Sequence, residues 1–80
     1  MKQDKEALRT EEIRLKRLRN IMDFTAALLW QADLTLGEAR KLVADARDRA
    51  LELFPDKGET IDLIYGSRFR RILAERYRLQ

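Results

Sequence analysis

Apolar positions are most concentrated between Ile21 and Ala32. At about 100° per residue, one stripe of a helix through this region contains Leu18, Ile21, Met22, Thr25, Leu28, Leu29 and Ala32. Phe24, Ala27 and Trp30 fall outside that stripe, so the segment is apolar nearly all round. Such a segment must be covered on more than one side, which predicts that other helices of the chain, or of a second copy, enclose it.

The same register extends toward the N-terminus. Every seventh position is apolar in the series Leu8, Leu15, Met22 and Leu29, with a companion series of Leu18, Thr25 and Ala32. This repeat predicts a long first helix over about residues 4–32; a later start after Thr10, as the cap, is the alternative. A helix of about 28 residues reaches ~42 Å, more than a compact domain of this size needs. We therefore expect residues 1–10 to project or fray.

A capping box marks the start of a second helix. Thr35 and Glu38 have the spacing at which the hydroxyl and the carboxylate each accept from the other residue's backbone N–H. The helix predicted here covers about residues 36–54, and its apolar stripe consists of Leu36, Ala39, Leu42, Val43, Ala46, Ala50, Leu53 and Phe54. The short connection makes the first helix its antiparallel neighbour.

Pro55 and Gly58 end the second helix, and one or two short helices are predicted after them, at about residues 59–65 and 68–79. Gly66 is interpreted as a left-handed helix terminus and Ser67 as the next N-cap. Arg76 falls on the apolar face of the last helix, where it is expected to extend toward solvent or to pair with Asp62. The predicted fold class is all-α: an antiparallel helical hairpin packed with these C-terminal helices in a single domain, residues 1–80.

Composition narrows the possible functions. The chain has 80 residues, near the size at which one core gives marginal stability, and no cysteine to form a disulfide or a thiolate metal site. The charged start excludes a secretory signal, and the longest apolar run is too short to span a membrane, so the default interpretation is a soluble cytoplasmic protein with no membrane partner. Net charge is +2 over residues 1–32, −3 over 33–62 and +4 over 63–80. This asymmetry suits antiparallel or head-to-tail contact between chains as well as it suits a phosphate partner.

Most catalytic chemistry is missing from the sequence. There is no histidine and no cysteine, so the commonest general base, the thiol nucleophile and the usual transition-metal ligands are all lacking. Ser67 has no histidine to activate it, and the three glycines are isolated, which excludes a phosphate-binding loop. Asp56, Glu59 and Asp62 miss the calcium-loop spacing and are interpreted as a solvated face. We therefore expect no catalytic, cofactor or metal site and no enzyme activity.

Protein association is the function class that remains. The apolar segment and the repeat before it predict a homodimer, or a surface for a partner helix, with the candidate interface residues Leu8, Leu15, Leu18, Met22, Phe24 and Trp30. The alternative is that the chain's own C-terminal helices cover Phe24 and Trp30.

A small DNA- or RNA-binding protein is the second hypothesis. Residues 59–65 and 68–79 would form a helix-turn-helix about Gly66, with candidate contacts from Arg68, Arg70, Arg71 and Arg78 and a second basic strip of Lys16, Arg17 and Arg19. Glu59 and Asp62 would repel phosphate beside it.

Overall fold

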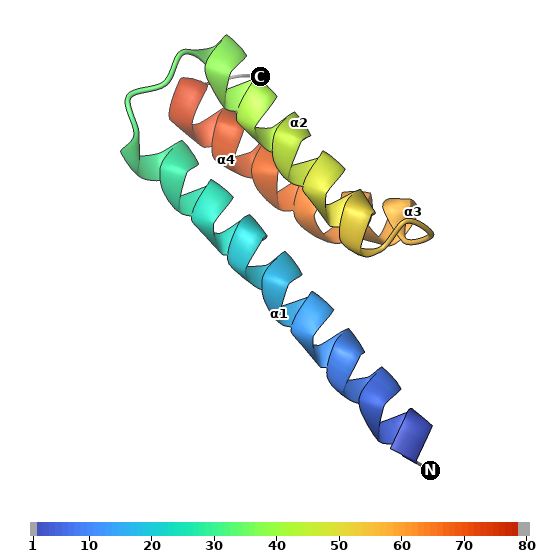
Figure 1. The fold of residues 1–80 in the computed structure, drawn as a ribbon. Helices are drawn as coiled ribbons and strands as arrows, with labels where there is room; N and C mark the ends of the chain where they lie inside the picture. Colours follow the sequence, from blue (N-terminus) through green and yellow to red (C-terminus); the bar gives the residue numbers. More distant parts are fainter. Residues whose placement is uncertain (1, 79–80) are drawn as a thin grey trace.

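The fold is all-α, as the apolar periodicity predicts. The computed structural model describes residues 2–78, and within that range it contains α1 (Lys2–Gln31), α2 (Leu36–Leu53), α3 (Gly58–Ile61), the π-helical turn η1 (Asp62–Gly66) and α4 (Ser67–Tyr77). Helices α1 and α2 form the predicted antiparallel hairpin, and α4 contacts both of them. The three long helices lie nearly parallel to one another (Figure 1).

The start of α2 confirms the predicted capping box. The Glu38 backbone N–H donates to Thr35 Oγ1 at 3.1 Å, and the Thr35 backbone N–H donates to Glu38 Oε1 at 3.0 Å. These two bonds satisfy donors that the first turn of a helix leaves without intrahelical partners. They fix the point at which the chain reverses after α1.

One apolar core holds the hairpin and the C-terminal segment together. Met22 and Leu29 of α1 have exposed fractions of 1% and 0%, and they pack in a cluster that also contains Leu18, Ala26, Ala39, Ala46, Ala50, Ile61, Phe69, Ile72 and Leu73. The alanines of α2 carry the smallest apolar side chains, which lets neighbouring helices approach closely. Thr25 is buried in the same layer, and its hydroxyl donates to the Ile21 carbonyl at 2.7 Å.

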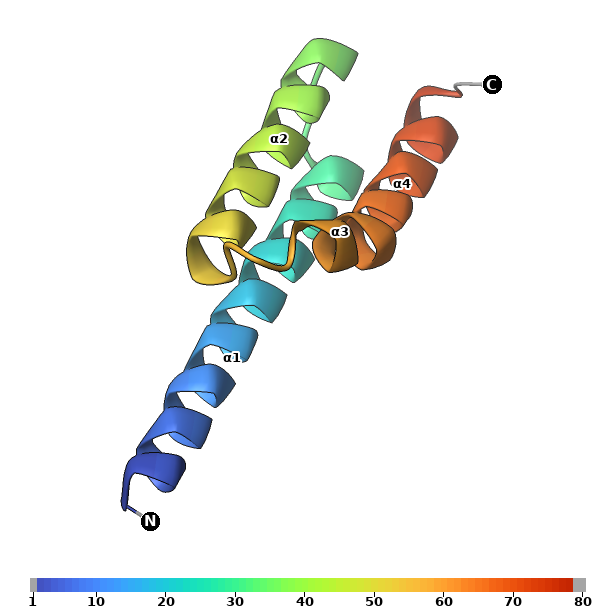
Figure 2. The same ribbon diagram turned by 90° about the vertical axis from the view of Figure 1, so that its right-hand side faces the viewer.

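The front half of α1 extends beyond this core. A helix of 30 residues is about 45 Å long, and the whole molecule measures 52 × 22 × 16 Å. Every side chain from residue 5 to residue 17 is exposed, and the N-terminal end lies well away from α2 and α4 (Figure 2). The front half of the helix therefore offers its full circumference to solvent.

The C-terminal segment differs from the prediction at Gly66. Gly66 has φ −58° and ψ −43°, Ser67 has φ −63° and ψ −42°, and neither forms a terminus or an N-cap. The chain remains helical from Gly58 to Tyr77, with η1 as a wide turn where the sequence predicted a break. The left-handed residue is Arg78 (φ 53°), which follows α4 and donates its N–H to the Ala74 carbonyl. The predicted end of the last helix, residue 79, lies outside the described residues.

Arg76 extends toward solvent as expected, but it does not pair with Asp62. Its guanidinium donates to the carbonyls of Trp30 at 2.9 Å and Ala32 at 2.8 Å, at the C-terminal end of α1. Asp62 is held instead by Arg47 of α2, at 2.7 Å. This hydrogen bond with Arg47 lowers the pKa of Asp62 and raises the pKa of Arg47. The arginine on the apolar face of α4 therefore caps another helix.

Candidate interaction surface

Large apolar side chains are exposed on several faces of the molecule. Among the described residues, those with exposed fractions of 42% to 74% are Leu8, Ile13, Leu15, Phe24, Trp30, Leu63 and Ile64. Scattered single apolar residues are normal on a protein surface, whereas contiguous ones mark interaction sites. Exposed apolar side chains that adjoin an apolar depression are therefore the candidates for an interaction site.

The structure divides the predicted interface residues into two groups. Leu18 and Met22 lie in the core of the chain itself, so their assignment to an interface is corrected: at their level of α1 the other helices already cover the seam. Leu8 and Leu15 are exposed on the projecting half, and Phe24 and Trp30 are exposed beside the bundle.

Phe24 and Trp30 differ in their surroundings. Phe24 has an exposed fraction of 66%, so the alternative in which the C-terminal helices cover it is wrong. Trp30 is 44% exposed and lies at a shallow hollow that it shares with Arg68, Arg71 and Ile72 of α4. The segment that is apolar nearly all round is thus covered on the sides of α2 and α4 and left open at Phe24.

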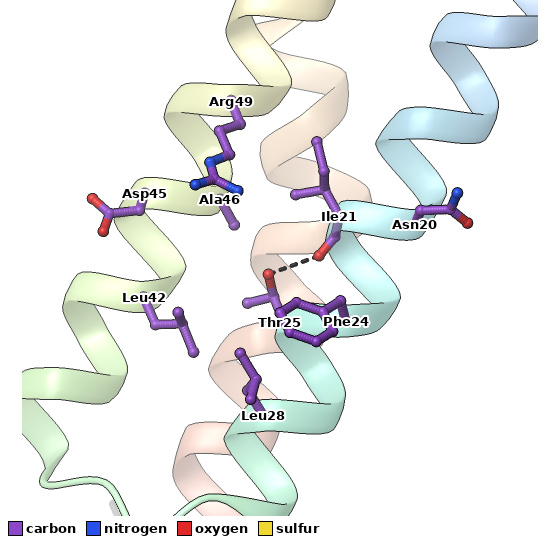
Figure 3. A pocket seen from close by; sticks show the side chains of 9 residues that line it. All are labelled: Asn20, Ile21, Phe24, Thr25, Leu28, Leu42, Asp45, Ala46 and Arg49. Atoms are coloured by element: carbon purple, nitrogen blue, oxygen red, sulfur yellow. Dashed lines mark hydrogen bonds between the residues drawn. The ribbon is translucent and has the colours of Figure 1, made fainter.

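A groove runs between α1 and α2 on that open side. Its first part, of about 450 Å³, is lined by Asn20, Ile21, Phe24, Thr25, Leu28, Leu42, Asp45, Ala46 and Arg49. In Figure 3, Leu28 and Leu42 lie in the space between the two helices, while Asn20 and Asp45 stand at its outer edges. A second part, of about 410 Å³, adds Arg17, Glu52 and Leu53 and shares Asn20, Ile21 and Arg49 with the first. We call the two parts together the hairpin groove.

The position of α4 explains why the hairpin groove is open. The C-terminal segment packs on the opposite side of the hairpin, so its ribbon lies behind the side chains drawn in Figure 3. With three long helices, only one side of the α1 and α2 pair can be covered by α4. Ile21, Leu28 and Leu42 give the groove apolar lining, while Asp45 points outward from it and the Arg49 side chain reaches into the space between the two helices (Figure 3).

A smaller hollow lies where α1 leaves the bundle. It has a volume of about 300 Å³, and Leu15 and Ile64 line it with the core residues Leu18 and Ile61. Glu11 of α1 borders the same hollow. This carboxylate continues the companion series of the seven-residue repeat, in which Leu18 and Ala32 are apolar. The lining of the hollow is nevertheless at least as apolar as that of the hairpin groove.

The C-terminal arginines do not form the predicted reading helix. A helix-turn-helix needs a turn between two helices that cross at a wide angle, and the continuous helical path through Gly66 provides none. Arg68 forms an ion pair with Asp23 at 3.2 Å, and Arg70 donates to Ser67 Oγ at 3.3 Å. Arg78 is the residue that terminates α4.

The second basic strip is separate from those arginines. Lys16, Arg17 and Arg19 are exposed on α1 where its projecting part meets the bundle, and Arg17 borders the hairpin groove. Within residues 2–78 the structure shows no cluster of three carboxylates that could hold a metal ion. None of the helices in this range is both long enough and apolar enough to cross a membrane.

Sequence reasoning missed three of the exposed apolar residues, namely Ile13, Leu63 and Ile64. A signal for Ile13 was present: it is eleven residues before Phe24, so the two lie about 20° apart on one face of a helix. For Leu63 and Ile64 the sequence contained no such signal, because the face they occupy depends on the wide turn η1.

Comparison with protein-family models, with curated proteins and with solved structures found no match for this chain.

Proposed function

We propose that this protein is a non-enzymatic helical protein that acts by protein association, and that it self-associates. The observation that supports this proposal is the exposed ring of Phe24 at the hairpin groove, on the side of α1 and α2 that α4 leaves open. Burial of a phenylalanine side chain is worth about 1.5–3 kcal/mol, so a partner that covers it gains substantially. An apolar groove between two helices also fits a third helix, as in helix-in-groove recognition.

Sedimentation equilibrium over micromolar to high micromolar concentrations tests the proposal. We expect a concentration-dependent dimer for the wild-type chain and a monomer for Phe24→Asp, because a charge in the covered groove loses hydration without gaining a partner. The monomer fold should survive this change, since the Phe24 side chain is 66% exposed. Far-UV circular dichroism and urea unfolding check that it does.

Leu63→Asp is the matched control. Its side chain is 74% exposed, on η1 and away from the hairpin groove, so the dimer should persist. A wild-type chain that stays monomeric at high micromolar concentration would contradict self-association. Equal loss of the dimer in both variants would instead mean that Phe24 has no particular part in it.

Nucleic-acid binding is the competing hypothesis, and the loss of the helix-turn-helix geometry removes its main support. Titration with duplex DNA at low and moderate salt distinguishes the two. Binding that falls steeply with salt and is abolished by Arg70→Ala with Arg71→Ala would contradict the proposal, because phosphate contacts produce that dependence.

A further inference from the structure

We propose that the exposed side of α4, together with the Trp30 ring, binds a segment of another protein that carries carboxylates beside a large apolar side chain. We call this the α4 surface, and its exposed residues are Trp30, Leu63, Ile64, Arg68, Arg70, Arg71 and Arg78. The inference goes beyond the proposed function, because it concerns a different partner and a surface that shares no residue with the hairpin groove.

The α4 surface has an apolar part that can take up a side chain. A hollow of about 310 Å³ lies between α1 and α4, and its apolar lining comes from Trp30, Ile64 and Ile72. Trp30 and Ile64 are 44% and 58% exposed although both border this hollow, and Leu63 beside them is 74% exposed. A large apolar side chain that enters the hollow therefore covers surface that the chain's own helices leave open.

Helix α4 presents its other side to solvent. Figure 2 shows α4 at the edge of the bundle, with no other helix of the described residues beyond it. Its buried residues Phe69, Ile72 and Leu73 belong to the core. Arg71 lies at least about 100° around the helix from each of these three, so its side chain starts from the exposed side.

The acids beside the α4 surface do not cancel its positive charge. Asp23 and Asp62 are each held by an arginine already, at 3.2 Å by Arg68 and at 2.7 Å by Arg47. Glu75 is the one acid of α4, and it borders the hollow.

Outside those two ion pairs, arginines outnumber the acid on α4 and the residue that follows it. The exposed arginines are Arg70, Arg71 and Arg78 against Glu75, which leaves a net charge of +2. The Arg76 guanidinium is engaged with the carbonyls of α1. Arg71 lines the hollow itself, and within residues 2–78 its side chain forms no ion pair. Such a surface attracts carboxylates and disfavours basic partners.

The guanidinium groups retain the donors that a carboxylate needs. Arg68 uses its Nη1 to donate to Asp23, and an arginine has five N–H donors in all. Two parallel hydrogen bonds from one arginine to one carboxylate are both strong and directional. Because Arg68 and Arg71 both line the hollow, a segment whose apolar side chain enters it can place carboxylates within reach of both arginines.

A protein segment suits the α4 surface better than a nucleic-acid strand. Glu75 borders the hollow, and a phosphate backbone that passes it brings a negative charge at every nucleotide. Trp30 is the only aromatic residue in the lining of the hollow, whereas proteins that bind single strands stack successive bases on several aromatic side chains. A peptide can place an uncharged residue next to Glu75.

Trp30 is the only tryptophan of the chain, so its fluorescence reports directly on the α4 surface. The probe is a short synthetic peptide with one leucine between two pairs of glutamates and no aromatic residue. We expect the Trp30 emission to move to shorter wavelength as this peptide is added, because the leucine excludes water from the ring. Binding should weaken as salt is raised. Matched peptides with glutamine for glutamate, or with serine for leucine, should each bind about tenfold more weakly or worse.

One pair of variants tests the role of the arginine. Arg71→Gln removes a guanidinium from the hollow, and the affinity for the glutamate peptide should fall about tenfold. Arg9→Gln makes the same change of charge on the front half of α1 and should bind as the wild-type chain does. Both arginines are exposed, so the fold should be unaffected, which far-UV circular dichroism checks.

The outcomes that would overturn the inference are distinct. One is an unchanged Trp30 emission with the glutamate peptide up to millimolar concentration at low salt. Others are equal affinity for the glutamate and glutamine peptides, or equal affinity of Arg71→Gln and Arg9→Gln. Tighter binding of an oligothymidine strand of the same charge, lost in Arg71→Gln, would assign the α4 surface to nucleic acid instead.

Phe24→Asp separates this inference from the proposed self-association. This variant should bind the glutamate peptide as the wild-type chain does, because Phe24 and Trp30 lie about 120° apart around α1. A monomeric wild-type chain that binds the peptide would therefore leave the inference standing while the proposed self-association fails. Loss of peptide binding in Phe24→Asp would place the peptide in the hairpin groove and overturn the inference.

Discussion

Arg76 shows how a single residue can look misplaced in a sequence and be satisfied in the fold. Its position on the apolar face of α4 brings the guanidinium to the last carbonyls of α1, where it donates two hydrogen bonds. The C-terminal end of a helix carries a partial negative charge and carbonyls without intrahelical partners, so a cation there is doubly favourable. Tyr77 adds a third link, since its hydroxyl donates to the Leu34 carbonyl at 2.7 Å.

We expect Arg76→Met to lower the free energy of unfolding by about 1–2 kcal/mol, because the apolar stem remains while two charge-assisted hydrogen bonds are lost in a solvent-exposed setting. Urea unfolding followed by circular dichroism measures the change. Arg70→Met is the control, because the hydrogen bond of Arg70 goes to Ser67 within α4 and links no other element. If the two variants are equally stable, the cap on α1 contributes nothing.

At the scale of elements, local signals decided some boundaries and tertiary packing decided others. The capping box and the repeat of apolar residues could be predicted because the chemistry is carried by neighbours in the sequence. The helical conformation of Gly66 could not be predicted, because burial of Ile61 and Phe69 holds the chain there. Both side chains are nearly inaccessible to solvent. In a regular α-helix these two would lie about 80° apart, and a wide turn between them reduces that angle.

Gly66→Ala separates the two interpretations of this position. An alanine Cβ would meet Asp62 Cβ at 3.8 Å, an ordinary contact, and the backbone is right-handed helical. We expect the free energy of unfolding to rise by about 0.5–1 kcal/mol, since alanine loses less conformational entropy than glycine in a helix. If Gly66 were a left-handed helix terminus, the same substitution would lower the free energy of unfolding. Thermal and urea unfolding both measure it.

The capping box makes the stability of α2 depend on pH. Hydrogen bonds from Thr35 lower the pKa of Glu38 from its ordinary value of 4.5. A carboxyl group whose pKa is lower in the folded chain than in the unfolded chain contributes its full stabilisation of the fold at pH values above the unfolded pKa. This contribution is lost as the pH falls through the folded pKa. The wild-type chain should therefore exceed Glu38→Gln in stability at neutral pH, with a difference that shrinks below about pH 4.5.

Urea unfolding at a series of pH values checks this expectation. Glu59→Gln on α3 removes a carboxylate that lies outside the capping box, and it controls for the loss of one negative charge. A difference between the wild-type chain and Glu38→Gln that stays constant down to strongly acidic pH would contradict a role for the ionised carboxylate.

For the whole molecule, the sequence predicted the hairpin, its core stripe and a first helix too long for the domain. It did not predict which side of the hairpin stays open, because that depends on where α4 docks. Of the candidate interface residues, Phe24 is exposed, whereas Leu18 and Met22 are buried in the core; the sequence did not separate them because the buried and exposed parts of one stripe have the same pattern.

The near-parallel arrangement of the three long helices in a molecule of 52 × 22 × 16 Å has a consequence for rotational diffusion. Backbone N–H bonds in α1, α2 and α4 point along the long axis, whereas those of the connection at residues 32–35 take other directions. Nitrogen-15 relaxation should therefore divide the amides into two groups by orientation alone, before any internal motion is considered.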